Sequence, residues 1–377
     1  MPIPSLMSIK RCVGFAIYSL LLSRLKLNFM VETNQVHRDL FALKRAYAAL
    51  RPPAQIKFPS YLRFSTIHEF LLRSILLDPH LQRHPPSRQY QTVFWKWAIA
   101  RLESFDELKQ NEARFVVDIL VDQVAMIVVS DPHTGPHPPS QSFLTHYWRT
   151  NHGEVGRCEA KSDGIDTSQY RLVTVMESRT TIERGTTGLR TWLASFVLAH
   201  YLTLNPDLVI GKCVLELGSG TGFLGIVIAA IQGSSPGTLW LTDVKESVLN
   251  RCHENVQLQC NLSSSKTNIQ YVPLDWFDAI DSSRRTRVEE LFENSIQPDI
   301  ILGADLVRDT VNARQSYLSI RTGNKLRVEE LECDWHSAPS FEIWEDGTDV
   351  NKGVRIHKIY GTKYLQIKRR NCRYKCK

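Results

Sequence analysis

One segment restricts the fold of this chain more than any other: Lys212–Gln232, which reads KCVLELGSGTGFLGIVIAAIQ. A short apolar run, a glycine-rich turn and a longer apolar run predict a buried strand that passes directly into a helix. The same alternation continues through TLWLTDVKESVLNRCHENVQLQCN, NIQYVPLDW and PDIILGAD. Strands that alternate with helices predict an α/β fold with a doubly wound, mostly parallel sheet. Ligands of such sheets bind at the carboxyl ends of the strands.

Pattern and composition divide the chain into five predicted parts. They are an extension without importance for folding (1–35), a helical N-terminal domain (36–130), a linker with a surface insertion (131–170), the α/β domain (171–360) and a basic tail (361–377).

The charge of the chain belongs to its C-terminal end. Net charge is +7, and the last 17 residues hold seven Lys or Arg and no acid, so the preceding residues sum to zero. This distribution favours a solvated tail and does not predict a specific nucleic-acid surface. The apolar stretch near the N-terminus, CVGFAIYSLLL, is too short to span a bilayer as a helix, so we expect no membrane contact.

Cysteine and histidine spacing predicts no metal site. None of the eight cysteines forms a C-x-x-C pair, which favours a reducing compartment, and we expect a cytoplasmic protein. His133, His137, His146 and His152 lie in and around a Pro-rich stretch without the fixed spacing of zinc ligands.

The turn LELGSGTGFLG suggests where a ligand binds. Gly218, Gly220 and Gly222 allow a sharp turn and close approach of the backbone to a ligand. Gly220-x-Gly222-x-x-Gly225 also matches a dinucleotide fingerprint, which is weak evidence alone. Glu216 beside the turn disfavours a pyrophosphate and favours a cationic, amino-bearing ligand.

Two further strand ends narrow the choice of cofactor. Asp243 ends the next strand, where a carboxylate accepts hydrogen bonds from both ribose hydroxyls. Asp275 and Trp276 end the third strand, where an aromatic face can cover adenine. A ribose ligand that carries positive charge and no phosphate describes S-adenosylmethionine.

The motifs GTTGLRTW, VLELGSGTGFLGI, LTDVKESVLNRCHENV, PLDWFD and PDIILGADLV resemble the seven-β-strand protein-lysine methyltransferases of methyltransferase family 16. The upstream FLLRSILLDPHLQRHPPSRQYQTVFWKWAIARLE resembles the helical N-terminal domain of its elongation factor 2 lysine methyltransferase branch in fungi. The resemblance covers about residues 36–360. It implies cofactor contacts from Trp192, the Gly218–Ser219–Gly220 turn, Asp243, Trp276 and Ala304, with Asp305 where the methyl group meets the lysine amine.

The resemblance implies a cytoplasmic, monomeric enzyme that methylates a lysine of translation elongation factor 2. An alternative of another class is an inactive or truncated relative that binds the elongation factor without catalysis. Methylation of nucleic acid is disfavoured because no [DNS]-P-P-[YF] motif follows the fourth strand. A nicotinamide enzyme is disfavoured by Glu216 and the LDW strand end.

The chain departs from the family after the fourth strand. The family continues GADLVY, whereas Arg308 follows Val307 here, and only 20 residues separate Asp305 from Leu326. That length fits one helix, so a central strand of the family is missing from this position. We therefore expect either that the closing hairpin, KLRVEELECDW with GVRIHKI, moves inward to pair with the fourth strand, or that the chain does not fold as the family does.

Overall fold

The computed structural model describes residues 35–105, 124–125, 141–149, 170–275, 278, 281, 283–304, 327–331, 341, 354–360 and 364–369. Two predicted site residues, Trp276 and Asp305, lie outside them, as do His133, His137 and His152. The residues that follow Ala304, up to 326, lie outside them as well.

A seven-stranded sheet forms the centre of the α/β part, in the order β5-β4-β3-β6-β9-β8-β7. The strands are β3 (Val214–Leu217), β4 (Leu239–Asp243), β5 (Ile269–Pro273), β6 (Ile300–Ala304), β7 (Arg327–Leu331), β8 (Val354–Tyr360) and β9 (Tyr364–Arg369). Five neighbouring strands of this order are parallel, namely β5, β4, β3, β6 and β9. β8 pairs antiparallel with β9, and β7 pairs antiparallel with β8. The prediction of a mostly parallel α/β sheet is confirmed.

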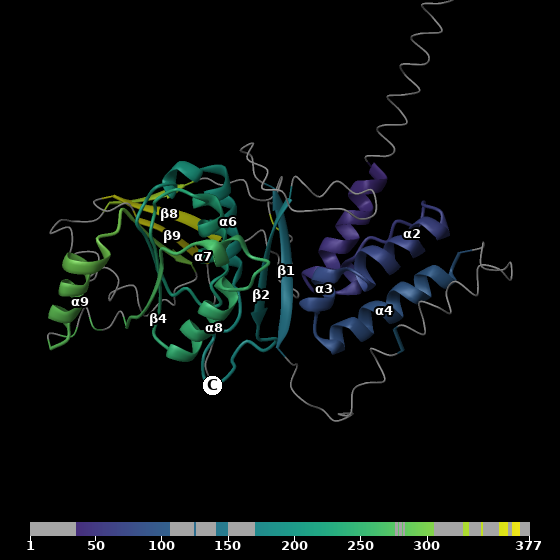
Figure 1. Ribbon diagram of the computed structural model, residues 1–377, viewed down its shortest axis with the longest axis horizontal. Coiled ribbons are helices and arrows are strands. Elements are labelled where there is room, and N and C mark those ends of the chain that lie inside the picture. The colour runs from purple at the N-terminus through teal and green to yellow at the C-terminus, as the bar shows by residue number, and fades with distance from the viewer. Residues whose placement is uncertain are drawn as a thin grey trace, which may run out of the picture.

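Helices alternate along the chain with the parallel strands β3 to β6, as the alternation in sequence predicts. They are α6 (Leu193–Leu204), α7 (Phe223–Gln232), α8 (Glu246–Val256) and α9 (Arg285–Leu291), with short turns η4 (Pro206–Leu208), η5 (Leu262–Ser265) and η7 (Phe292–Ile296). Nearly every side chain of α7 is buried, because this helix packs between the sheet and a second layer of strands (Figure 1). The helix α7, which follows the glycine turn, therefore has packing partners on both of its faces.

The structure corrects the expectation for the C-terminal end. Residues 364–369, predicted as part of a solvated basic tail, form β9 between β6 and β8. β9 runs parallel to β6, with Ile301 opposite Tyr364 and Ala304 opposite Ile367. The hairpin of β7 and β8 does not pair with β6, so the predicted inward shift is wrong. A later segment takes the empty position and satisfies the backbone groups of β6.

A second correction concerns the segment 131–170, predicted as linker and insertion. Its residues Ser142–Arg149 form β1, which pairs along its whole length with β2 (Tyr170–Glu177) in a separate antiparallel sheet. The hairpin stands between the helices of the α/β part and the N-terminal helices (Figure 1). Leu144, Trp148, Val173 and Val175 join the core of the α/β part, and Tyr147 joins the N-terminal core.

Two buried asparagines attach β2 to the region of α8. The Asn255 amide accepts from Met176 N (2.8 Å) and donates to Met176 O (3.1 Å). The Asn261 amide does the same at Thr174, at 2.8 Å in both directions. At Thr174 and Met176 these side chains take the place of a neighbouring strand at the free edge of β2 and give the backbone groups partners.

The N-terminal helices pack around an aromatic core. They are a helix over 35–48, η1 (Pro53–Gln55), α2 (Phe64–Phe70), η2 (Leu71–Leu76), α3 (Pro79–Arg83) and α4 (Arg88–Glu103). Tyr47, Phe94 and Trp95 lie within 5.9 Å of one another, measured between ring centroids, and are fully buried or nearly so. Ile67, Phe70, Leu71 and Ile75, which recur at helical spacing in the sequence, are buried as well. These aromatic side chains therefore form the core of the N-terminal helices.

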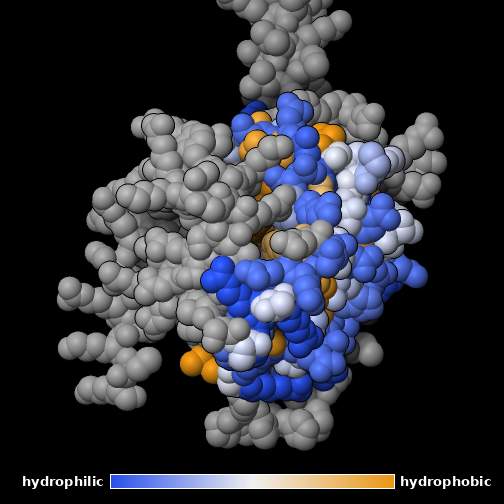
Figure 2. Space-filling model, turned by 90° about the vertical axis from the view of Figure 1, so that its left-hand side faces the viewer, coloured by the Kyte–Doolittle hydropathy of each residue, from blue (hydrophilic) through white to orange (hydrophobic). Residues whose placement is uncertain are grey.

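The surface at the α9 end is mostly hydrophilic, with scattered apolar spots among the described atoms (Figure 2). This agrees with the sequence of α9, RTRVEEL, of which only Val288 is buried. Within the described part of the chain, no helix is long and apolar enough to cross a membrane.

A shortened chain tests the role of β9. A chain that ends after Tyr360 loses β9, so β6 and β8 each lose a row of backbone hydrogen bonds beside exposed apolar surface. We expect no cooperative unfolding transition from this variant in urea, followed by far-UV circular dichroism. A chain that ends after Arg369 keeps β9 and serves as the control. An unchanged unfolding midpoint for the shorter chain would contradict the topology.

Candidate active site

Four parallel strands that precede or contain predicted site residues end at one edge of the sheet. Leu217 of β3 lies opposite Gly303 of β6 and Thr242 of β4, and Asp243 lies opposite Pro273 of β5. The polar residues that follow these strands therefore share one edge, where doubly wound sheets bind ligands.

The glycine turn requires glycine for two different reasons. Gly222 has φ +84° and is the N-cap residue of α7, and a Cβ there would lie 2.8 Å from the Cys252 Sγ of α8. Gly220 has φ +54°, and a Cβ would lie 3.2 Å from the Gly188 carbonyl oxygen. Gly222 thus permits close packing of two helices, while Gly220 permits close approach of a second loop.

Asp243 is held at the end of β4 by backbone donors. Gly220 N donates to its Oδ2 (3.2 Å), and Val244 N donates to its Oδ1 (2.8 Å). Burial raises the pKa of this carboxyl, and the backbone N–H groups act in the opposite direction. Oδ1 also accepts a long hydrogen bond from Lys245 N (3.4 Å), and Oδ2 keeps a lone pair for a ligand hydroxyl. The side chain is therefore fixed in orientation and still able to accept hydrogen bonds.

Ser219 supports the turn from inside. Its hydroxyl accepts from Thr242 N (3.1 Å), and its N–H donates to Thr242 O (2.7 Å). Its side chain is buried. Ser219 therefore ties the end of β3 to the end of β4, and its hydroxyl has a structural use.

Glu216 is more deeply buried than we expected for a residue beside the glycine turn. Its side chain is 2% exposed, and its Oε2 has no hydrogen-bond partner among the described residues. This oxygen lies 3.3 Å from the Cβ position that Gly225 leaves empty beneath α7. Burial raises the pKa of Glu216 to about 8, a hydrogen bond from Ser219 lowers it, and Asp243 raises it further. A cation bound nearby would favour the ionised form.

A loop before α6 contacts the glycine turn and ends at Trp192, which the resemblance assigned to the cofactor site. Thr191 Oγ1 lies 2.8 Å from Thr221 Oγ1, and Lys245 Nζ donates to Gly185 O at 2.5 Å. Trp192 precedes α6 and donates from Nε1 to Thr187 O (3.1 Å). Sequence reasoning named Trp192 through the resemblance but missed Thr191 and Lys245, whose contacts hold the loop in place. The available signal for Thr191 was its place in GTTGLRTW, a segment rich in threonine and glycine.

The remaining predicted residues follow the outer strands. Asp275 comes two residues after β5, and its carbonyl accepts from Asp278 N (3.1 Å). Ala304 ends β6 and is half-buried. Trp276 and Asp305, adjacent to them in sequence, lie outside the described residues. Of the four histidines considered as ligands, His146 is described; its ring packs on Phe196 and Phe223 at 4.9 and 5.5 Å.

Comparisons with known proteins agree with this geometry. A family model described as lysine methyltransferase matches residues 176–315. Protein-lysine N-methyltransferase EFM3 of Chaetomium thermophilum is 29% identical over 250 residues, which cover 66% of this chain and 67% of the relative. Protein-lysine N-methyltransferase EEF2KMT of Bos taurus is 30% identical over 299 residues (73% and 75%). The Homo sapiens protein of that name is 32% identical over 250 residues (63% and 62%).

The buried carboxyl of Glu216 predicts a pH dependence of stability. Between its ordinary pKa of 4.5 and about 8, the folded protein keeps a proton that the unfolded chain has lost. Raising the pH through this window therefore lowers the free energy of unfolding, by at most about 1.4 kcal/mol per pH unit. Glu216→Gln removes this titration, so its stability relative to the native sequence should rise from about pH 5 to about pH 8 in urea unfolding.

Glu246→Gln removes an acid from the exposed first turn of α8 and is the matched control. Its stability difference from the native sequence should change little over the same pH range. Parallel pH curves for Glu216→Gln and the native protein would contradict the burial of an ionisable Glu216.

Proposed function

The chain belongs to the lysine methyltransferase family, whose methyl donor is S-adenosylmethionine, and we propose that its substrate is a lysine of translation elongation factor 2, methylated in the cytoplasm by a monomeric enzyme. The main support for the proposed cofactor site is one pair of hydrogen bonds. Gly220 N and Val244 N donate to the Asp243 carboxylate and hold it at the strand edge. Relatives named EFM3 and EEF2KMT, together with the N-terminal helices, support the choice of substrate.

We assign the cofactor site residue by residue. Asp243 accepts the ribose hydroxyls, and Gly218 and Gly220 leave room for the ligand beside the backbone. Ser219 and Gly222 shape the turn, as their contacts with Thr242 and Cys252 indicate. The other residues assigned to the site are Trp192, Glu216, Asp275, Trp276 and Ala304.

The residues present fit a cationic nucleoside. Asp243 ends β4 at the strand edge, and Glu216 of the neighbouring β3 has one buried carboxyl oxygen without a partner in the described part of the chain. When bound, S-adenosylmethionine supplies an electrophilic methyl group on a sulfonium. Glu216 acts through its charge and not by direct contact, because its carboxyl lies beneath α7.

The protein's part in the chemistry is to position a lysine and remove water from it. A lysine amine has a reference pKa of about 10.4, and its protonated form has no lone pair for attack. A partly dry channel beside positive charge disfavours the ammonium ion and lowers that pKa. We propose that Asp305, next in sequence after Ala304, orients the amine by a hydrogen bond while the proton leaves to water. Position and desolvation supply most of the rate.

Cofactor binding is the first test of this site. Asp243→Ala removes the acceptors proposed for two ribose hydroxyls, each worth about 1.5–3 kcal/mol when the acceptor is charged. We expect calorimetry to show at least about tenfold weaker binding of S-adenosylmethionine. Asp207→Ala, in the exposed turn η4, is the control and should bind like the native protein. Equal affinities for all three proteins would overturn the role of Asp243.

Methyl transfer tests the substrate and Asp305 together. Incubation of the full chain with elongation factor 2 and S-adenosylmethionine should give methyl-lysine, detected by mass spectrometry. Asp305→Asn should lower kcat by about tenfold or more without weakening cofactor binding, because it removes the charge that orients the amine. Cofactor binding without methyl-lysine on elongation factor 2 would instead favour the non-catalytic relative.

A further inference from the structure

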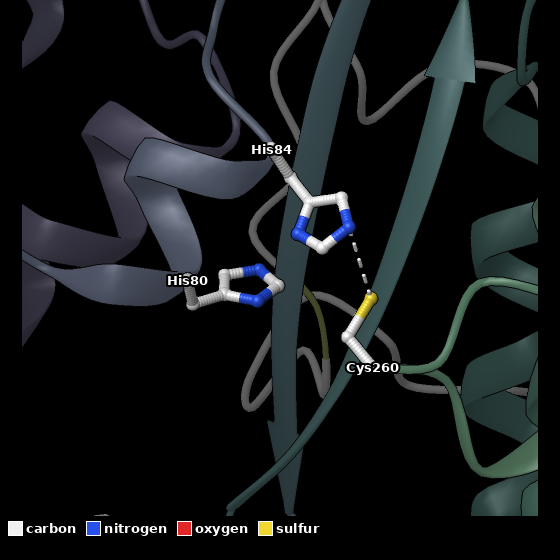
Figure 3. A group of neighbouring side chains, drawn as sticks. All are labelled: His80, His84 and Cys260. Atoms are coloured by element: carbon white, nitrogen blue, oxygen red, sulfur yellow. Dashed lines mark hydrogen bonds between the residues drawn. The ribbon is translucent and has the colours of Figure 1, made fainter.

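A cluster of three metal-ligand side chains lies away from the active site, between the N-terminal helices and the α/β part. His80 and His84 come from α3 and its C-terminal cap, and Cys260 comes from the loop between α8 and η5. One ligand atom from each residue lies within 4.8 Å of the other two. Figure 3 shows the two imidazole rings reaching from α3 toward the Cys260 thiol, beside the strands of the hairpin.

The distances suit a transition-metal ion after small side-chain movements. The His84 Nε2 and Cys260 Sγ atoms are 3.9 Å apart, and the two imidazole centroids are 4.9 Å apart. Zinc bonds of about 2.0–2.1 Å to nitrogen and 2.3 Å to sulfur place tetrahedral ligands about 3.3–3.6 Å apart. The His84–Cys260 pair is therefore within a few tenths of an ångström of a ligand pair.

The polar atoms of His84 are not explained by hydrogen bonds. The residue is 7% exposed, and its Nδ1 has no hydrogen-bond partner among the described residues. Within the described part of the chain, its Nε2 makes a long contact with the Cys260 sulfur (3.9 Å). A buried ring nitrogen without a partner is costly, and metal ligation is one of the few ways to use it.

The ring of His80 is oriented by hydroxyl groups of the hairpin. Its Nε2 lies 3.0 Å from Thr145 Oγ1 and 3.2 Å from Thr174 Oγ1, and the two hydroxyls are 2.9 Å apart. These contacts engage Nε2 and fix the orientation of the ring. Metal-binding histidines commonly have their second nitrogen held in this way.

The elements that carry the three ligands are themselves fixed. Asp78 caps α3 by accepting from Leu81 N (2.9 Å), and it forms an ion pair with Lys44 at 2.7 Å. On the other side, Cys260 precedes Asn261, whose amide is bonded to Thr174. The three side chains are therefore held near one another before any ion binds, which lowers the entropic cost of forming the site.

We propose that His80, His84 and Cys260 bind one Zn²⁺ ion, with water at the fourth position, and that this ion fastens α3 to the loop after α8. Two imidazoles and one thiolate are a ligand set that zinc uses in proteins, and three protein ligands leave one tetrahedral position for water. Cys260 loses its thiol proton to solvent as the Zn–S bond forms, so charge and atoms balance. The ion joins residues 176 positions apart in the chain.

Cobalt titration of the full chain tests the site directly. Co²⁺ takes the same ligands as zinc and gives a thiolate-to-metal charge-transfer band when a cysteine binds it. We expect this band to saturate at one equivalent, to disappear on addition of Zn²⁺ and to be absent from Cys260→Ser. His84→Gln should weaken Co²⁺ binding by more than the 10–100-fold that loss of an outer-shell partner costs.

Two matched variants control for cysteines and histidines elsewhere. Cys213→Ser changes a half-buried thiol at the start of β3, and His253→Gln changes an exposed ring on α8. Both should keep the band, and far-UV circular dichroism should confirm that every variant is folded. Zn²⁺ should raise the thermal midpoint of the native protein and not that of Cys260→Ser. Lack of a band in the native protein, or a band that survives Cys260→Ser, would overturn the proposal.

Discussion

The attachment of β2 to Asn255 and Asn261 is the interaction on which the arrangement of the two parts of the chain depends. An antiparallel hairpin has a free edge, and here two side-chain amides fill it where a third strand would otherwise pair. Each buried amide hydrogen bond left unmade costs about 1–3 kcal/mol, against a total stability of about 5–15 kcal/mol. The hairpin, whose Tyr147 joins the N-terminal core, is therefore held by a few specific bonds as well as by apolar packing.

The same two asparagines connect the hairpin to the site. Asn255 Nδ2 also donates to Thr221 O (2.9 Å) within the glycine turn, and Asn261 Nδ2 donates to Asn255 O (2.7 Å). The turn is thus supported from β2 through Asn255 and from the preceding loop through Thr191. Nothing in this network requires the side chains that face the ligand, so the shape of the turn is set before a cofactor binds. Preorganisation of this kind reduces the cost of binding.

Sequence predicted the elements whose local residue pattern matches their surroundings in the folded protein. Strand, glycine turn and helix follow one another in 212–232, and Asp243 lies at the strand end where it was expected. The strand at 142–149 was missed because hairpin residues are buried on both faces, which removes the alternation that identifies a strand. The strand at 364–369 was missed because the basic residues around it suggested a solvated tail, and its parallel partner β6 is 60 residues away. Pairing at such a distance has no local signal.

The cluster of His80, His84 and Cys260 shows the same limit for chemistry. Histidines four residues apart lie on one face of a helix, and this spacing stands in the sequence as HLQRH. By itself it is common and uninformative, and the third ligand lies in another layer of the fold. Only the position of α3 against the loop after α8, set by Asp78 on one side and Asn261 on the other, makes the three residues neighbours. The bonds that attach the hairpin therefore also assemble the proposed zinc site, so occupancy of that site and attachment of the N-terminal helices should depend on each other.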